Sequence, residues 1–286
     1  MVTAGIVEYD PDSMRFHLPP EHAALLTRAA GPQNLAAFTQ FLPVIAEVEQ
    51  DVIDCFSSGG GVGYEHYRDF HRTMGELSAM QFDAALVPAV LPLVPDIVGK
   101  LEAGIAVADV GCGRGHAVNL MAREFPESTF VGLDISEEVL GEARSEAAEM
   151  GLTNASFEHC DAPLMDRIEE YDFITTFDAV HDQVDPRGTV EAIHRALKPV
   201  GTWLCADSAA SSELGDNVDH PLGPMMYTIS CMHCTSVSLA GGGEGLGAMW
   251  GEQRARELFA AAGFEDITVR RVEGDVANNY YVCRRS

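Results

Sequence analysis

Apolar positions in the C-terminal two thirds of the chain form short continuous runs that alternate with stretches of helical spacing. The runs predict strands at residues 106–110, 129–133, 156–159, 173–177 and 202–206. Helices are predicted between them at about 115–124, 136–150 and 186–197, and a helix at 254–262 precedes a closing strand pair at 267–272 and 279–283. Because continuous apolar strands that alternate with helices are typical of a parallel sheet covered on both faces, the pattern predicts a doubly wound α/β fold.

The first 95 residues follow a different pattern, which predicts a separate and mainly helical region. Residues 5–18 alternate in polarity around Asp10-Pro11-Asp12-Ser13, which indicates a β-hairpin. Helical spacing runs from Asn34 to Phe56, and Pro43 should kink or split this helix. The glycine-rich residues 57–63 are interpreted as a flexible connector, and a second helical region is predicted from Tyr64 to about Leu93. We therefore divide the chain into residues 1–95 and 96–286.

A turn of alternating glycines, Gly111-Cys112-Gly113-Arg114-Gly115, follows the first strand of the second region and opens a helix. A nucleotide-binding βαβ unit has this form. Dinucleotide sites use G-x-G-x-x-G, where the third glycine lets the helix pack closely, but that position is His116 here. The G-x-G-x-G turn suits a cofactor with an ammonium and a carboxylate, since small residues let the backbone approach closely.

Acidic residues lie at or near the carboxyl ends of three predicted strands, at positions that suit such a cofactor. Asp109 stands just before the turn and can hold the cation directly or through water. Asp134 ends the second strand and can accept both hydroxyls of a ribose, and Asp161 follows the third strand, where an adenine amino group would lie.

Residues 107–207 resemble the S-adenosylmethionine-binding core of the class I methyltransferases. The resemblance is carried by the segments ADVGCGRG, VGLDIS, HCDAP, YDFITTFDAVHD and HRALKPVGTW. It implies a Rossmann-like sheet of seven strands in the order 3-2-1-4-5-7-6, with S-adenosyl-L-methionine as the cofactor and S-adenosyl-L-homocysteine as the product. The residues expected at the cofactor are Asp109, Gly111, Cys112, Gly113, Gly115, Asp134, Ile135, Asp161, Ala162, Phe177 and Asp178.

His181 is the leading candidate for a general base, because it follows the fourth strand at the edge where ligands of such sheets bind. Asp182 is the candidate to orient it. The segment Val180 to Gln183 resembles the His-Asp-Trp segment of small-molecule O-methyltransferases with a winged-helix N-domain, in which the histidine is the base; Gln183 replaces the tryptophan. Many other class I methyltransferases have a histidine here that is not a base, so both roles stay open.

The whole chain resembles a bacterial group of winged-helix-containing methyltransferases of small molecules. The carrying segments are MVTAGIVEYDP, LPPEHAALL, GGGVGYEHYRDFHRTM and MYTISCMHCTSVSLAGGGEGLGAMWGEQRARELFAAAGF. The resemblance implies that the hairpin belongs to a winged helix whose earlier helices are not in this chain, so residues 1–95 would contain a truncated remnant. A homodimer that forms through this region is possible, but the truncation argues against it.

Residues 208–250 are too long for a simple connection and are expected to form a lid over the substrate. Residues 64–74, which end in FHRTM, are similar to the Phe-Asn-x-x-Met helix that covers cofactor and substrate in the O-methyltransferases. Tyr64 and His71 are favoured as lining or packing residues over proton acceptors. The apolar residues of the insert could equally form a small separate core or a dimer interface instead of a substrate pocket. The expected substrate-pocket residues are Tyr64, Phe70, His71, Met74, Met226, His233 and Trp250.

Composition and charge limit the classes of partner that the protein can bind. The net charge is −26, and the only lysines are Lys100 and Lys198, so nucleic acid and anionic membranes are disfavoured as partners. Seven scattered cysteines indicate reduced thiols, and no basic and apolar leader opens the sequence, which together predict a cytoplasmic protein. The cluster Cys231-Met232-His233-Cys234 lacks a second pair to complete four ligands, so no metal is expected.

These patterns favour an S-adenosylmethionine-dependent methyltransferase that acts on a small apolar or aromatic metabolite at oxygen, with nitrogen or carbon as the next choices. A non-catalytic regulator that senses S-adenosylmethionine is the alternative from another class. A nicotinamide oxidoreductase is a weaker one, because His116 occupies the third-glycine position. The sequence does not identify the methyl acceptor.

Overall fold

The computed structural model describes residues 1–286, apart from the side chain of Gln33. Its centre is a sheet in the order β5-β4-β3-β6-β7-β9-β8, which confirms the predicted 3-2-1-4-5-7-6 arrangement. Strands β3 to β7 are parallel, and β9 is antiparallel to both of its neighbours. The strands are β3 (Ala106–Val110), β4 (Thr129–Asp134), β5 (Ala155–His159), β6 (Tyr171–Phe177), β7 (Leu197–Ser208), β8 (Asp266–Arg270) and β9 (Asn278–Arg284).

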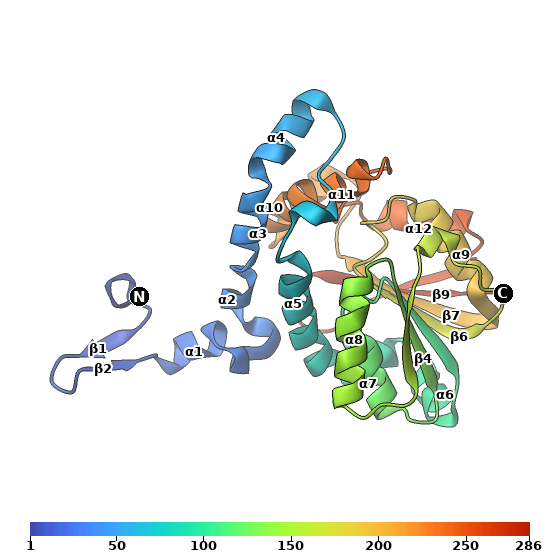
Figure 1. Cartoon of the computed structure of the whole chain (residues 1–286), viewed down its shortest axis with the longest axis horizontal. Helices are drawn as coiled ribbons and strands as arrows, with labels where there is room; N and C mark the ends of the chain where they lie inside the picture. The colour runs from blue at the N-terminus through green and yellow to red at the C-terminus, as the bar shows by residue number, and fades with distance from the viewer.

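Helices cover both faces of this sheet and bury a separate apolar core on each (Figure 1). One face is covered by α6 (Ile97–Ala103), α7 (His116–Glu124) and α8 (Glu137–Glu149), and the other by α9 (Pro186–Ala196) and α12 (Glu252–Ala261). The second core is built around Trp203, whose ring lies 4.6 Å from that of Phe259. Two-sided burial explains why the parallel strands read as continuous apolar runs.

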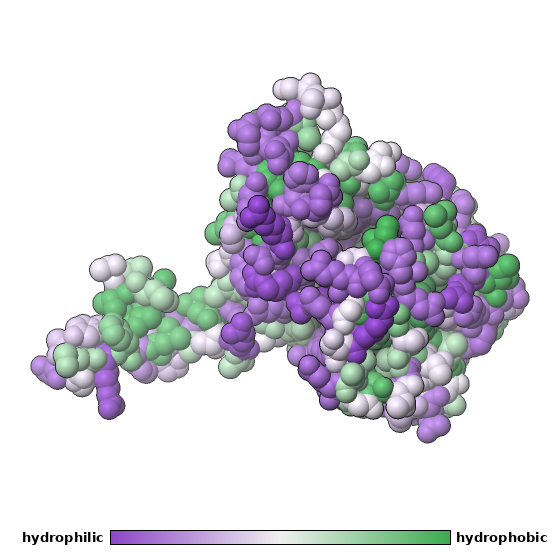
Figure 2. Space-filling view, viewed as in Figure 1, coloured by the Kyte–Doolittle hydropathy of each residue, from purple (hydrophilic) through white to green (hydrophobic). Residues whose placement is uncertain are grey.

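The N-terminal end projects from this body as an extended arm (Figure 1). It consists of the predicted hairpin, β1 (Glu8–Asp10) and β2 (Arg15–His17), and of α1 (Pro20–Leu26). Apolar side chains gather on the arm (Figure 2), where Met14 is 76% and Phe16 69% exposed. The arm therefore leaves apolar surface in contact with solvent.

The helix predicted around Pro43 is split, as the sequence indicated. It forms α2 (Leu35–Phe38), α3 (Phe41–Glu47) and α4 (Glu49–Ser58). Pro43 lies in the first turn of α3, where a missing N–H leaves no intrahelical hydrogen bond unmade. The next helical region is also divided: a 3-10 turn at Tyr64–His66 precedes α5 (Phe70–Ala85), and a π-helix and a 3-10 turn follow it as far as Leu93.

The insert forms a helical layer that joins the N-terminal helices to the carboxyl edge of the sheet. It contains α10 (Gly223–Ile229), a π-helix at Ser230–Cys234 and α11 (Thr235–Ala240). The glycine-rich connector is packed against this layer rather than free: a Cβ atom on Gly61 would lie 1.9 Å from the carbonyl oxygen of Ser236, and the Val62 N–H donates to Ser236 Oγ at 2.8 Å. A third apolar cluster lies between the N-terminal helices and the insert, and it includes Phe41, Val52, Phe70 and Val237.

Among the described residues, no single helix is long and apolar enough to cross a membrane. The helical stretches Phe70–Leu93 and Ile97–Ala103 meet the length and composition requirement only as a pair, and they are bent by 105°.

Candidate active site

The glycine turn between β3 and α7 holds the carboxylate of Asp134 in a fixed position. The Gly113 N–H donates to Asp134 Oδ2 at 2.8 Å, and the Ser136 N–H donates to Oδ1 at 2.9 Å. Gly113 has a φ of +51°, and a Cβ atom there would meet nothing within 4 Å. The turn therefore leaves open space beside a carboxylate that keeps lone pairs for further donors.

Gly115 supplies the close helix packing that a dinucleotide site obtains from its third glycine. A Cβ atom on Gly115 would lie 2.4 Å from the ring of Phe157 and 2.6 Å from Ala143. Only glycine fits at this point. The turn itself is fixed to β4, since the N–H groups of Gly111 and Cys112 both donate to the Leu133 carbonyl.

His116 ties the helix after the turn to two neighbouring helices. Its Nδ1 lies 2.6 Å from Glu146 Oε1 on α8, and its Nε2 lies 3.1 Å from Asp83 Oδ1 on α5. Burial alone would lower the pKa of His116, but the two carboxylates outweigh it and raise the pKa. In addition, α5 crosses the turn so closely that a Cβ atom on Gly75 would meet the Arg114 side chain. Helix α5 thus covers the turn.

The edge next to Asp134 fits the adenosine part of a nucleotide cofactor. Ile135 is 59% exposed, and Leu164, two residues after Ala162, is 75% exposed. Ala162 itself is buried and Asp161 half-buried at the end of β5. Exposed apolar side chains beside an acid that accepts hydroxyl protons are the features that a ribose and a purine require. The residues present therefore fit the expected cofactor.

Asp109 lies deeper than a cofactor contact requires. It is 3% exposed, and its Oδ1 accepts a hydrogen bond from Thr175 Oγ1 at 2.7 Å on the adjacent strand. Burial raises the pKa of Asp109 to about 7. The carboxyl group thus links β3 to β6, and its predicted contact with a cation stays a prediction.

Phe177 is the last residue of β6, and Asp178 follows it. Phe177 packs edge-on against Phe82 of α5, with the ring centres 4.9 Å apart, and both line a narrow crevice of about 20 Å³. Asp178 has a φ of +52°, a conformation that is strained for a residue with a side chain. Burial and the nearby Asp207 raise the pKa of Asp178 to about 7.

The Nδ1 side of His181 contacts a carboxylate that the sequence prediction did not include among the site residues. Its Nδ1 lies 2.8 Å from Oδ1 of Asp207, at the end of β7. The same oxygen accepts hydrogen bonds from Trp250 Nε1 at 2.9 Å and from the Ser208 N–H at 2.8 Å. Asp207 is completely buried. An acid at the carboxyl end of a strand, the signal that identified Asp134, would have found it.

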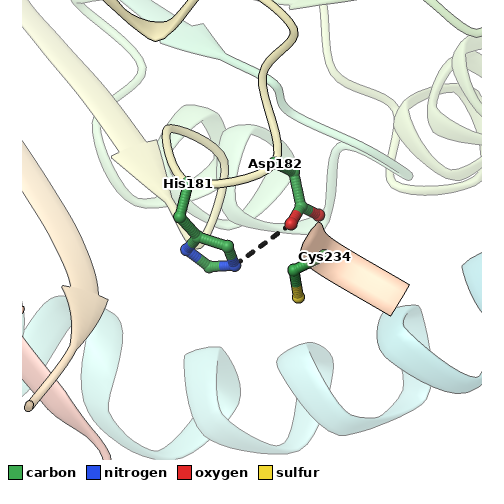
Figure 3. A group of neighbouring side chains, drawn as sticks. All are labelled: His181, Asp182 and Cys234. Atoms are coloured by element: carbon green, nitrogen blue, oxygen red, sulfur yellow. Dashed lines mark ion pairs between the residues drawn. The ribbon is translucent and has the colours of Figure 1, made fainter. Parts of the chain in front are cut away.

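The other face of His181 meets Asp182 and the insert (Figure 3). Nε2 lies 3.3 Å from Asp182 Oδ1, and Oδ2 of Asp182 accepts a hydrogen bond from the Tyr64 hydroxyl at 3.2 Å. Burial lowers the pKa of His181, but Asp207 and Asp182 outweigh it and raise the pKa well above its usual range. Burial and Asp182 also raise the pKa of Tyr64, so its phenol stays protonated and donates.

His233 lies in a box of aromatic rings next to this pair. It stacks on Phe70 with the ring centres 3.5 Å apart and meets the edges of Tyr67 and Tyr64 at 4.7 and 5.3 Å. It is 1% exposed, and neither ring nitrogen has a hydrogen-bond partner in the protein. Burial lowers the pKa of His233 to about 4, so the ring is neutral. His71 stacks on the outer side of Tyr64.

The structure brings five of the predicted pocket residues together between α5 and the insert: Tyr64, Phe70, His71, Met74 and His233. Met226 is half-buried on α10, and its predicted place in the pocket stays a prediction. Trp250 lies behind Asp207 and lines a different cleft of about 300 Å³ along α12. Its indole N–H donates to Asp207, and its predicted place in the substrate pocket stays a prediction.

Two family profiles match the chain. One, described as a methyltransferase domain, matches residues 101–263, and the other, a Rv2258c-like winged HTH domain, matches residues 1–28. A curated relative, the ubiquinone biosynthesis O-methyltransferase of Leptothrix cholodnii, is 32% identical over 119 residues, which are 41% of this chain and 49% of that protein. The chain thus spans about half the length of the curated relatives it matches.

Solved structures of low sequence identity share the fold. An O-methyltransferase candidate of Nostoc punctiforme superposes with a TM-score of 0.73 at 18% identity, over 99% of this chain and 81% of that one. The human N-acetylserotonin methyltransferase, solved with S-adenosylmethionine, gives a TM-score of 0.65 at 16% identity, over 100% of this chain and 80% of that one.

Proposed function

Because this chain belongs to the methyltransferase domain family, whose profile spans over half of it, we propose that it is an S-adenosylmethionine-dependent methyltransferase acting on a hydroxyl group of a small apolar or aromatic molecule. The proposal rests on the pairing of His181 with the buried Asp207, next to a cluster of aromatic side chains between α5 and the insert.

The cofactor site in this proposal is the edge formed by the glycine turn and the ends of β4, β5 and β6. Asp134 accepts from the ribose hydroxyls, Ile135 and Ala162 line the adenine, and Gly113 gives the amino-acid end access to the backbone. Phe177 and Asp178 border the site from β6. When bound, S-adenosylmethionine supplies an electrophilic methyl group on a sulfonium.

His181 accepts the proton of the acceptor hydroxyl in the proposed reaction. Asp207 holds Nδ1, which leaves Nε2 as the nitrogen that takes the proton. Because the carboxylates around the ring raise the pKa of His181, the ring accepts a proton only where the pH keeps it neutral, and methyl transfer should therefore decrease as pH falls through that pKa. Asp182 is fixed by Tyr64 and orients the ring on its other side.

The aromatic box supports a planar, mostly apolar acceptor. Phe70, Tyr64 and Tyr67 surround His233, which has a neutral ring whose nitrogens have no protein partner. A buried polar atom without a partner costs free energy, so a ligand that donates a hydrogen bond to His233 gains it back. Several relatives are named as ubiquinone biosynthesis O-methyltransferases, which supports oxygen as the acceptor atom.

We further propose a small molecule, rather than nucleic acid or a membrane, as the partner, because a net charge of −26 repels anionic surfaces. A homodimer that covers the apolar arm and a cytoplasmic location both stay predictions.

The test is transfer of a tritium-labelled methyl group from S-adenosylmethionine to a panel of phenols, catechols and hydroquinones, with matched amines alongside. We expect transfer to at least one hydroxyl acceptor and a decrease in kcat of about 10²–10⁴-fold in His181→Ala, the range for loss of a general base. His17→Ala, an exposed histidine on β2, is the matched control. Unchanged turnover in His181→Ala would remove this residue from the mechanism. Cofactor binding without transfer to any acceptor would favour the sensing regulator.

A further inference from the structure

Three potential metal ligands converge at one point between the end of β6 and the insert (Figure 3). His181 and Asp182 come from the loop after β6, and Cys234 comes from the last position of the π-helix in the insert. The imidazole nitrogen, the carboxylate oxygen and the thiol sulfur all lie within 4.8 Å of one another. His181 and Cys234 are buried, and Asp182 is half-buried.

The contact between His181 and Asp182 has the separation of two metal ligands but not the geometry of a hydrogen bond. Nε2 and Oδ1 are 3.3 Å apart, yet Oδ1 is buried without a hydrogen-bond partner. In a tetrahedral zinc site, bonds of about 2.0–2.2 Å to nitrogen and oxygen place those two ligand atoms about 3.3–3.5 Å apart. A cation between them would satisfy the unpartnered oxygen.

Two of the three ligands also have the outer partners that a metal site needs. Asp207 accepts from His181 Nδ1 at 2.8 Å, the carboxylate–histidine arrangement that directs Nε2 toward a metal. The second oxygen of Asp182 accepts from the Tyr64 hydroxyl. These contacts fix the orientation of the imidazole and of the carboxylate before any cation arrives.

We propose that His181, Asp182 and Cys234 form a binding site for Zn²⁺, and that zinc bound there stops methyl transfer. Zinc takes nitrogen, oxygen and sulfur ligands together, whereas Mg²⁺ prefers six oxygen ligands. The second half of the inference rests on the proposed function, because zinc occupies the Nε2 lone pair that otherwise accepts the acceptor's proton. Three protein ligands leave the fourth position for water.

The experiment titrates Co²⁺, a coloured substitute for zinc, into the metal-free full-length chain. We expect the visible bands of a tetrahedral cobalt site and a near-ultraviolet thiolate band, both lost when Zn²⁺ is added. Cys234→Ser should lose the thiolate band and bind at least tenfold more weakly. Cys231→Ser, an exposed cysteine on the same π-helix, is the matched control and should behave as wild type. Asp207→Asn should weaken binding by about 10–100-fold, as changes behind a ligating histidine do.

Methyl transfer is then measured with the acceptor found above. Zn²⁺ should inhibit wild type and Cys231→Ser, and inhibition of Cys234→Ser should need at least tenfold more zinc while its activity without metal is kept. Mg²⁺ should have no effect.

Absence of the cobalt bands in wild type, or bands that survive in Cys234→Ser, would overturn the site; the latter result would point to the neighbouring group of Asp178, His181 and Asp207. Should Cys234→Ser fold poorly, Asp182→Asn replaces it with the same expected loss of affinity. Zinc that binds but leaves transfer unchanged would overturn the inhibition alone. The cobalt spectra need no methyl acceptor, so failure of the proposed function does not obscure them.

Discussion

Replacement of Asp207 by asparagine tests the support of His181 most sharply. One oxygen of Asp207 accepts from His181, Trp250 and Ser208 at 2.8, 2.9 and 2.8 Å, while the other oxygen is buried without a partner. The asparagine carbonyl can keep the first position, but its NH₂ group then occupies the second without an acceptor. That change removes the charge facing His181 and adds a buried unpaired donor, which costs about 1–3 kcal/mol of unfolding free energy.

The effect on catalysis should be larger than the effect on stability. Without the carboxylate, the tautomer and orientation of His181 are no longer fixed, and we expect kcat to decrease by about 10²–10⁴-fold, which is about 3–5 kcal/mol of activation free energy. Trp250→Phe removes one donor and keeps the charge, so it should cost about 1 kcal/mol in stability and less than about tenfold in kcat. Steady-state kinetics and urea unfolding measure both. A wild-type kcat in Asp207→Asn, or equal losses in the two variants, would show that the charge of Asp207 does not position His181.

Three further predictions concern the cofactor turn and the insert. Gly113→Ala forces a side chain into the left-handed region, at about 1–2 kcal/mol of stability, and into the space reserved for the cofactor, so calorimetry should show at least tenfold weaker binding of S-adenosylhomocysteine; unchanged affinity would contradict this placement. Because the pKa of His116 is raised in the folded state, its pairing with Glu146 stabilises the fold fully below the unfolded pKa and less as pH rises through the folded pKa. The free energy of unfolding of the wild type, measured in urea, should therefore decrease over that pH interval, whereas that of His116→Gln should not. Parallel curves of unfolding free energy against pH for the two proteins would exclude a contribution from His116. Gly61→Ala should separate the connector from Ser236 and lower the Tm by several degrees, as a clash with backbone costs about 1–3 kcal/mol; an unchanged Tm would show that this contact adds nothing.

The sheet and the cofactor turn could be predicted from the sequence because their signals are local. Each strand is a short apolar run, and Gly113 and Asp134 stand at strand ends that parallel pairing brings to one edge. The role of His116 was harder to predict. Its partners Glu146 and Asp83 lie 30 and 33 residues away, on helices whose relative placement no local pattern gives.

The parts of the site that depend on long-range packing could not be predicted from the sequence. The contact of Gly61 with Ser236 joins segments far apart in the chain, and the connector therefore looked free. Likewise, the indole N–H of Trp250 donates to the buried carboxylate of Asp207, which lies 43 residues away in the sequence, and no local pattern indicates that pairing. Buried polar groups must find partners wherever the fold brings them, so such pairings emerge only in three dimensions.

Calorimetric titration with S-adenosylhomocysteine and with NAD decides whether the glycine turn and Asp134 bind S-adenosylmethionine. We expect S-adenosylhomocysteine to bind and NAD not to bind. Asp134→Ala should weaken the binding of S-adenosylhomocysteine at least tenfold through lost ribose contacts, whereas Asp216→Ala, which changes an exposed acid in the insert, should leave it unchanged. Binding of NAD in preference to S-adenosylhomocysteine, or an affinity that is independent of Asp134, would show that this turn is not a site for S-adenosylmethionine.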